Sequence, residues 1–172
     1  MTGFDRATLR KAVAKRTSQA IDDLCALVRH DSLLGNEASA QDWIPDQFAQ
    51  MGPDVERVTI DIDALRDQPG FSPPVIDDYD GRENVVGLHR PKNPTGRSLI
   101  LNGHMDVVPT GPVDQWRRGP FDPHVDGDWL YGRGAGDMKA GIIAYCHALR
   151  ALHDIGLEPA APVTLQSVIE EE

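Results

Sequence analysis

Three short stretches of the chain carry residue types that could do metal or hydrolytic chemistry. They are NGHMDVVP at 102–109, GRGAGDMKAG at 132–141 and EEE at 170–172. Imidazole and carboxylate groups suit Zn²⁺, Co²⁺ or Mn²⁺, provided that the fold brings them together. Each stretch alone has an ordinary structural explanation, because an Asp before a helix is often only a cap. The elements that carry the stretches therefore decide what they mean.

The predicted secondary structure places all three stretches at one edge of a sheet. The apolar run RSLILNGHMD (97–106) predicts a strand buried on both faces, and VTLQSVI (163–169) predicts another strand directly before the glutamates. Between them, apolar residues at helical spacing predict a helix that starts at Asp137 and ends before Gly156. If this helix is a crossover between parallel strands, its start and both strand ends share the edge where α/β proteins bind ligands.

The three consecutive glutamates raise an electrostatic question. Adjacent carboxylates at a buried edge repel one another and resist desolvation, and a divalent cation would compensate them. In a continuing strand, Glu170 and Glu172 would point to one side and Glu171 to the other. Neighbouring glutamates are then expected to have different roles. The glycines at 132, 134 and 136 fit neither the dinucleotide fingerprint nor the P-loop spacing, which excludes those two readings.

The rest of the chain predicts a mixed α/β protein. Helical periodicity covers 7–30 and a second segment that Asn36 could cap, while alternation at 58–62 predicts a strand. Further predicted elements are a long Pro- and Gly-rich loop at 66–83, a strand at 84–90 and a hairpin at 124–132 that turns at Asp126-Gly127.

The composition of the chain limits which partners it could bind and in which cellular compartment it is expected. A chain of 172 residues, 40% of them hydrophobic, suffices for one globular domain. The net charge of −10 without a basic run makes nucleic acid and anionic membrane poor partners. No apolar stretch predicts a membrane span or a secretory leader, so a cytoplasmic location is expected. Cys25 and Cys146 lie in apolar helical patterns and are expected to be reduced core residues.

Together the motifs resemble those of the dinuclear zinc amidohydrolases and peptidases that include acetylornithine deacetylase and succinyl-diaminopimelate desuccinylase. The similarity runs through LNGHMDVVP, WRRGPFDPHVDGDWLYGRGAGDMKAG and VIEEE, in the family's order. It implies the N-terminal part of a zinc-peptidase-like α/β catalytic domain, with a mixed, mostly parallel sheet flanked by helices. Residues 1–172 would be an incomplete catalytic domain that lacks its C-terminal part and the lid or dimerisation domain.

The resemblance also implies the metal ligands. His104, Asp137 and Glu172 would bind two divalent metal ions, with Asp137 as the bridging carboxylate. Zn²⁺ is the expected metal, with Co²⁺ and Mn²⁺ as alternatives. The family commonly has a cis peptide bond after the bridging residue, which here is the bond between Asp137 and Met138.

Two further acids receive catalytic roles by resemblance. Asp106 would hold the second nitrogen of His104, and Glu171 would be the general base. Glu170 takes the place of an acid that the family usually has there, without a direct catalytic role.

The implied reaction is the metal-dependent hydrolysis of the amide bond of an N-acyl amino acid by a metal-activated water. The partners would be an N-acyl amino acid or short peptide, and the parent enzyme would be a homodimer. Two alternatives remain open: a dipeptidase or carboxypeptidase of the same family, and an inactive fragment without catalysis. The 172 residues alone are expected to be inactive.

Overall fold

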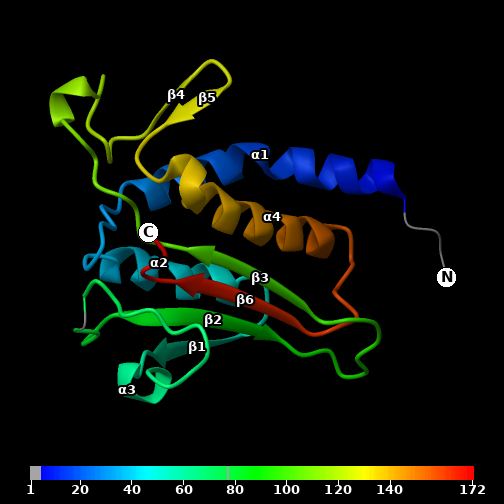
Figure 1. Cartoon of the computed structure of the whole chain (residues 1–172). Coiled ribbons are helices and arrows are strands. Elements are labelled where there is room, and N and C mark those ends of the chain that lie inside the picture. Colours follow the sequence, from blue (N-terminus) through cyan, green and yellow to red (C-terminus); the bar gives the residue numbers. More distant parts are fainter. Residues whose placement is uncertain (1–4, 77) are drawn as a thin grey trace.

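A four-stranded sheet with the order β1-β2-β6-β3 forms the centre of the molecule (Figure 1). The structure is a computed structural model that describes residues 5–76 and 78–172; residues 1–4 and residue 77 of the predicted 66–83 loop lie outside the described residues. The predicted α/β class, with a mixed sheet flanked by helices, is confirmed. The strands are β1 (Asp54–Thr59), β2 (Glu83–His89), β3 (Leu99–His104) and β6 (Val163–Val168).

The expectation of a mostly parallel sheet is wrong for the described strands. β3 and β6 are parallel, whereas the β1–β2 and β2–β6 pairs are antiparallel. A parallel pair needs a long crossover, usually a helix. The connection from β1 to β2 contains only the four-residue helix α3 (Ile62–Leu65) among its described residues, which is too short for that purpose.

Helix α4 (Ala140–Asp154) makes the predicted crossover between the parallel strands β3 and β6. The register places His104 opposite Val168, so the carboxyl ends of both strands lie at one edge of the sheet. The preceding turn η2 (Ala135–Lys139) reaches the same edge because α4 must return across the sheet from there. The three chemical stretches are thereby brought together, as predicted.

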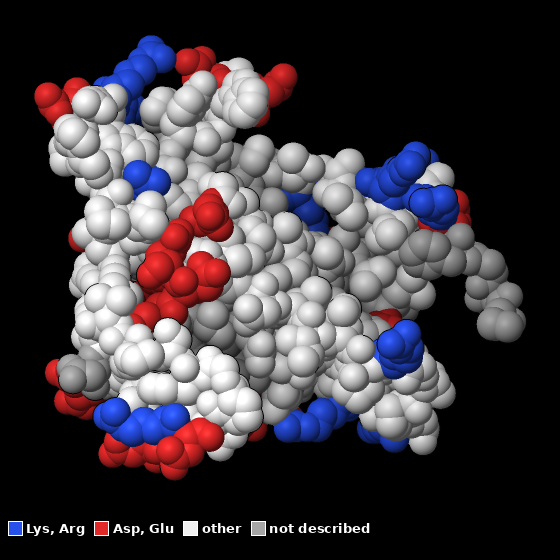
Figure 2. All heavy atoms as spheres, viewed as in Figure 1, with Lys and Arg blue, Asp and Glu red and all other residues white. Residues whose placement is uncertain are grey.

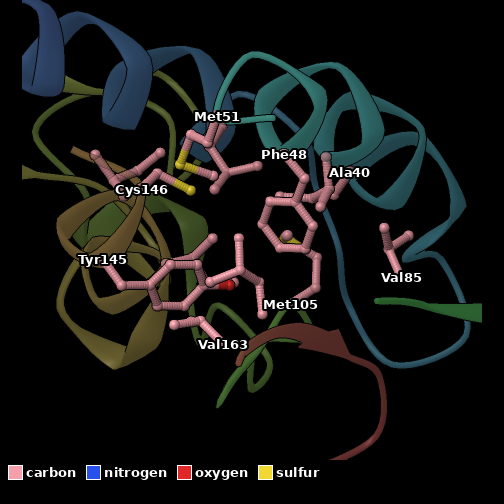
Figure 3. Close-up of a cluster of buried hydrophobic side chains, with 13 residues drawn as sticks. Ala40, Phe48, Met51, Val85, Met105, Tyr145, Cys146 and Val163 are labelled. Atoms are coloured by element: carbon pink, nitrogen blue, oxygen red, sulfur yellow. The ribbon is translucent and has the colours of Figure 1, made fainter. Parts of the chain in front are cut away.

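The hydrophobic core lies between one face of the sheet and three helices. These are α1 (Arg6–Val28), α2 (Ala38–Ala49) and α4. Phe48 of α2 and Tyr145 of α4 meet with ring centroids 6.1 Å apart, and Val85 and Val163 reach them from the sheet (Figure 3). Burying one such apolar side chain contributes about 1.5–3 kcal/mol, so this layer holds the helices on the sheet.

The opposite face of the sheet is largely uncharged (Figure 2), and the side chains that the central strands β2 and β6 place on it are half-buried. Figure 2 views this face, on which a broad surface without Lys, Arg, Asp or Glu extends beside the acidic group. The prediction that the strand at 97–106 is buried on both faces is wrong, because β3 is an edge strand of the described sheet and Leu99 and Ile100 are 49% and 62% exposed. Leu101 of β3 packs against the core cluster, whereas Ile100 lies on the opposite face beside Thr164.

Local capping chemistry explains the shifted element boundaries. α1 starts as predicted, with the Asp5 carboxylate accepting from the main-chain N–H groups of Ala7 and Thr8. The strand predicted at 58–62 ends earlier, because Asp61 accepts the N–H of Ala64 and starts α3. Asn36 does not cap α2; its amide donates to the main-chain oxygen of Asp31.

The predicted hairpin at 124–132 is confirmed. The hairpin pairs β4 (His124–Asp126) with β5 (Trp129–Tyr131), and a short 3₁₀ turn, η1 (Val113–Gln115), precedes it. Both cysteines are free, with Cys146 buried and Cys25 half-buried. None of the helices in the described part of the chain is long and apolar enough to cross a membrane.

Candidate metal centre

His104 ends strand β3 with its ring almost fully buried, at 3% exposure. Its Nδ1 lies 3.0 Å from the main-chain oxygen of Asp106. A carbonyl oxygen can only accept, so Nδ1 carries a hydrogen, and in the neutral imidazole it is Nε2 that presents the lone pair. Asp106 thus meets the second ring nitrogen mainly through its backbone, since its carboxylate Oδ1 is 3.5 Å away. The imidazole is held in the tautomer that a metal ligand requires.

Asp137 projects into the same space from turn η2. Its Oδ1 lies 3.4 Å from Nε2 of His104, and its side chain is 84% exposed. The prediction that the helix starts at Asp137 is wrong: Asp137 has extended backbone angles (φ −119°, ψ 104°), and α4 begins only at Ala140. The peptide bond between Asp137 and Met138 is cis, as the resemblance implied.

The glutamates follow the end of β6 and turn toward Asp106. The Oδ2 atom of Asp106 accepts the main-chain N–H groups of Glu171 and Glu172, at 3.0 and 2.9 Å. Strand alternation does not extend to these residues, because β6 ends at Val168 and Glu170 has a left-handed backbone with φ 63°. The Oε2 atom of Glu171 then lies 3.6 Å from Nε2 of His104.

The donor set fits a divalent metal. One ligand atom each from His104, Asp137 and Glu172 can be chosen so that all three lie within 4.8 Å of one another. The lone pair of His104 Nε2 faces carboxylate oxygens, an arrangement that a divalent cation would complete. Oδ1 of Asp106 is buried without a hydrogen-bond partner in the described residues, which adds negative charge beside the site. Acidic side chains gather on the surface where the chain ends beyond β6 (Figures 1 and 2).

A buried ion pair behind the site was not predicted. The guanidinium of Arg82 donates to both oxygens of Glu37, at 2.9 and 3.1 Å, and the two side chains are only 7% and 1% exposed. Arg82 also lies 3.5 Å from the Glu170 carboxylate, which accepts the Tyr79 hydroxyl. Burial and the hydrogen bond to Glu170 raise the pKa of Tyr79 to about 12. The partners are too far apart in the sequence for any spacing rule to find them.

Lys139 faces away from the site despite its position in the motif. Its Nζ donates to the main-chain oxygens of Leu27 and His30, at 3.1 and 2.7 Å, where α1 ends. Burial lowers the pKa of this amine to about 8. The side chain therefore ties α1 to the metal-site turn, since exposed carbonyls at a helix end need donors.

Residues 100–172 match the family model described as peptidase family M20/M25/M40. The match covers 73 of the 172 residues, and over this segment the chain is similar to that family. The resemblance inferred from the motifs is thereby confirmed for this segment. All five residues that the sequence singled out lie inside the matched segment: His104, Asp106, Asp137, Glu171 and Glu172.

Two curated proteins with similar sequences have names that describe different reactions. The N-formyl-4-amino-5-aminomethyl-2-methylpyrimidine deformylase of Bacillus subtilis (strain 168) is 39% identical over 104 residues, covering 60% of this chain and 24% of that protein. The succinyl-diaminopimelate desuccinylase of Methylorubrum extorquens (strain PA1) is 36% identical over 129 residues, covering 75% and 29%. The chain thus spans only about a quarter of these relatives.

Solved structures share the fold at lower sequence identity. The dipeptidase Dug1p from Saccharomyces cerevisiae superposes with a TM-score of 0.76 at 18% identity, covering 96% of this chain and 34% of that one. Human carnosine dipeptidase 1 superposes with a TM-score of 0.75 at 18% identity, covering 94% of this chain and 34% of that one. The M20 family metallo-carboxypeptidase Sso-CP2 from Sulfolobus solfataricus superposes with a TM-score of 0.68 at 21% identity, covering 89% of this chain and 31% of that one.

Proposed function

We propose that this chain carries part of the active site of an enzyme that hydrolyses the amide bond of an N-acyl amino acid, of the acetylornithine deacetylase or succinyl-diaminopimelate desuccinylase type. The observation that carries the proposal is the convergence of His104, Asp137 and Glu172 at one sheet edge. The deformylase and desuccinylase relatives both have names that describe removal of an acyl group, which favours this reaction over peptide cleavage.

His104, Asp137 and Glu172 would hold two divalent ions, with Asp137 shared between them. Zn²⁺ suits this combination of imidazole and carboxylates best, and Co²⁺ or Mn²⁺ are the alternatives. When bound, the ions supply Lewis acidity that polarises an amide carbonyl and lowers the pKa of water. The buried His104 ring would present Nε2 to a metal ion, because Nδ1 donates to the Asp106 carbonyl.

Glu171 would take the proton from the attacking water and deliver it to the leaving amine. Its carboxylate is 62% exposed and lies beside His104, so it can reach both solvent and substrate. The order of the two glutamates in the motif supports this assignment of Glu171 as base and Glu172 as ligand. Asp106 would keep both in place through their main-chain N–H groups.

We further propose that residues 1–172 form an incomplete catalytic domain of a longer, cytoplasmic and homodimeric enzyme that acts on small molecules. The short coverage of the relatives supports this proposal. The second candidate function is a dipeptidase or carboxypeptidase, which the dipeptidase folds favour. An inactive fragment without catalysis is the third alternative.

Calorimetric titration of the 172-residue chain with Zn²⁺ tests the site. His104→Ala should lower the affinity about 10–100-fold, whereas His153→Ala on α4, outside the cluster, should leave it unchanged. Equal affinities for both variants would refute the metal centre.

The reaction needs a longer protein that contains this chain. A panel of N-acetylornithine, N-succinyl-diaminopimelate and dipeptides distinguishes deacylase from peptidase. Glu171→Gln in that protein should lower kcat about 10²–10⁴-fold. The 172-residue chain alone should bind Zn²⁺ weakly and show no turnover.

A further inference from the structure

We infer that Glu170 is a positioning residue, whose carboxylate fixes the backbone turn that aims Glu171 and Glu172 at His104 and Asp106. The inference rests on the proposed function of Glu171 and Glu172 as base and ligand, and adds the structural cause of their placement. Glu170 itself touches neither the His104 ring nor Asp137 among the contacts of the described residues.

The backbone at Glu170 departs from the strand. β6 ends at Val168, and the N–H of Ile169 leaves the ladder to donate to Oδ1 of Asn84, at 3.0 Å. Glu170 then adopts φ 63°, a left-handed conformation that residues with a Cβ adopt rarely. Among the described residues, Glu170 is the one non-glycine with positive φ. Such a conformation persists only where surrounding contacts determine it.

The Glu170 carboxylate supplies those contacts. Its Oε1 accepts the main-chain N–H of Val75 at 2.9 Å, and Ile76 N lies 3.5 Å away. Its Oε2 accepts the Tyr79 hydroxyl and lies 3.5 Å from Nη2 of Arg82. With only 11% of the side chain exposed, each oxygen is occupied by donors, and a carboxylate can only accept. The side chain is therefore fixed at both of its oxygens.

The donors are themselves anchored in the core. Arg82 is paired with the buried carboxylate of Glu37, directly before α2. Tyr79 packs under the guanidinium of Arg82, which lies 5.0 Å from the ring centroid. The chain of contacts from Glu37 through Arg82 to Glu170 thus ties the end of β6 to the helical layer. A displaced Glu170 would have to break buried charge-assisted hydrogen bonds.

Glu171 and Glu172 lie between two clamps. Glu170 and its donors hold the backbone on one side, and Asp106 Oδ2 accepts both N–H groups on the other. Asp106 contacts only the Glu171 and Glu172 amides, so it does not by itself fix the backbone turn at Glu170. The left-handed residue is what changes the direction of the chain after β6, so that Glu171 reaches within 3.6 Å of His104.

A competing role is that Glu170 merely fastens the loop that contains Val75 and Tyr79. Both roles predict loss of stability when Glu170 is changed, so stability cannot separate them. They differ in which amides become mobile. Positioning predicts release of the Glu171 and Glu172 amides, whereas loop fastening predicts release of the Val75 and Ile76 amides only.

Amide hydrogen exchange on the metal-free, ¹⁵N-labelled chain tests the inference without any metal. Glu170→Gln keeps the length of the side chain but replaces one acceptor oxygen by a donor. It should accelerate exchange of the Glu171 and Glu172 amides at least about tenfold, with the Leu165 amide in β6 unchanged. Asp80→Asn is the control, because it makes the same charge change on an exposed residue of the same loop.

Tyr79→Phe is the second variant, since it deletes only the hydroxyl that Glu170 accepts. It should reproduce the effect on the Glu171 and Glu172 amides more weakly, even where Glu170→Gln fails to fold. Unchanged Glu171 and Glu172 exchange in a folded variant, with only the Val75 and Ile76 amides accelerated, would overturn the inference.

A Co²⁺ titration provides the spectroscopic readout. In Glu170→Gln the visible absorption bands of bound Co²⁺ should shift and the affinity should fall about 10–100-fold, because Glu172 is displaced. If the wild-type chain binds no Co²⁺ at all, the proposed function fails, while the amide exchange still decides the role of Glu170. Identical Co²⁺ spectra in wild type and Glu170→Gln would count against positioning.

Discussion

The main-chain N–H of Glu172 donates to Oδ2 of Asp106 at 2.9 Å, across 66 residues of sequence. This bond joins the segment after β6 to the segment after β3. The main-chain oxygen of Asp106 meets His104 at the same time. Asp106 therefore sets the spacing between His104 and Glu172, the two proposed ligands, through its backbone and its side chain.

Replacing Asp106 should weaken metal binding without changing any proposed ligand. Asp106→Ala removes the acceptor of two N–H groups, so Glu171 and Glu172 lose their anchor. The affinity for Zn²⁺, measured by calorimetry, should fall about 10–100-fold. Asp114→Ala removes an exposed acid of η1 and should have no effect. Wild-type affinity in Asp106→Ala would show that the anchor is dispensable.

The ion pair of Glu37 and Arg82 should be costly to break on one side only. Glu37→Gln removes the nearer carboxylate of the buried guanidinium and leaves only Glu170, at 3.5 Å, so the loss should approach about 3–5 kcal/mol, the typical cost of a broken buried pair. Urea unfolding measures this loss. In the double variant Glu37→Leu/Arg82→Met part of the stability should return, because the Glu37–Arg82 pair is removed as a whole, while the Glu170 carboxylate loses its contact with Arg82.

A surface pair provides the contrast to that result. Asp63 and Arg66 form an exposed pair on and beside α3, and Asp63→Asn should leave the urea midpoint unchanged. If Glu37→Gln behaved like Asp63→Asn, the buried pair would contribute nothing to stability.

Two glycines that both have positive φ should lose different amounts of stability when replaced by alanine. Gly134 has φ 73°, and an added Cβ would lie 2.3 Å from Cγ1 of Val107. Gly127 in the hairpin has φ 61° with nothing within 4 Å. Gly127→Ala should cost about 1–2 kcal/mol from the left-handed backbone alone. Gly134→Ala should cost about 1–3 kcal/mol more through overpacking, measured by thermal or urea unfolding. Equal losses would mean that Val107 moves aside freely.

Gly134→Ala should also disturb the metal site, because Gly134 directly precedes the turn that carries Asp137. Zn²⁺ affinity should fall in Gly134→Ala and stay at the wild-type value in Gly127→Ala. A stable Gly134→Ala protein with full affinity would contradict the geometry of this turn.

The thiol of Cys146 should resist alkylation in the folded protein. Burial raises its pKa to about 12, and the side chain is 1% exposed. The thiolate is the reactive form, so iodoacetamide at pH 8.5 should leave Cys146 unmodified while the chain is folded. At pH 10 the reaction should still be far slower than that of the unfolded chain, because only a small fraction of the thiol is ionised below a pKa of about 12.

Cys25→Ser isolates this measurement, since Cys146 is then the one thiol of the chain. In urea, both cysteines of the wild type should react at similar rates. Rapid labelling of Cys146 in the folded Cys25→Ser protein would show that the α4 face opens readily.

Local sequence patterns predicted most of the elements for identifiable reasons. Apolar residues at helical spacing predicted α1 and α4, and the Asp126-Gly127 turn predicted the hairpin. Predicted element boundaries were wrong where a side chain forms a hydrogen bond with the backbone. Asp61, for example, accepts the Ala64 N–H, and the strand before it ends early. The composition of β3 predicted burial, yet burial depends on what covers the sheet, which composition does not record.

The sequence by itself determined the residue types and the order of the site. A His, an Asp and a glutamate pair that follow successive elements had to meet if the crossover was parallel, because parallel strands end at one edge. The roles of Asp106 and Glu170 depend on contacts between segments that are far apart in the sequence, so no spacing rule could predict them. Tertiary structure alone decided that Asp106 holds the glutamates by their backbone, and that Glu170 turns the chain with the help of Tyr79 and Arg82. These contacts join residues 65–91 positions apart, so only folding could bring them together.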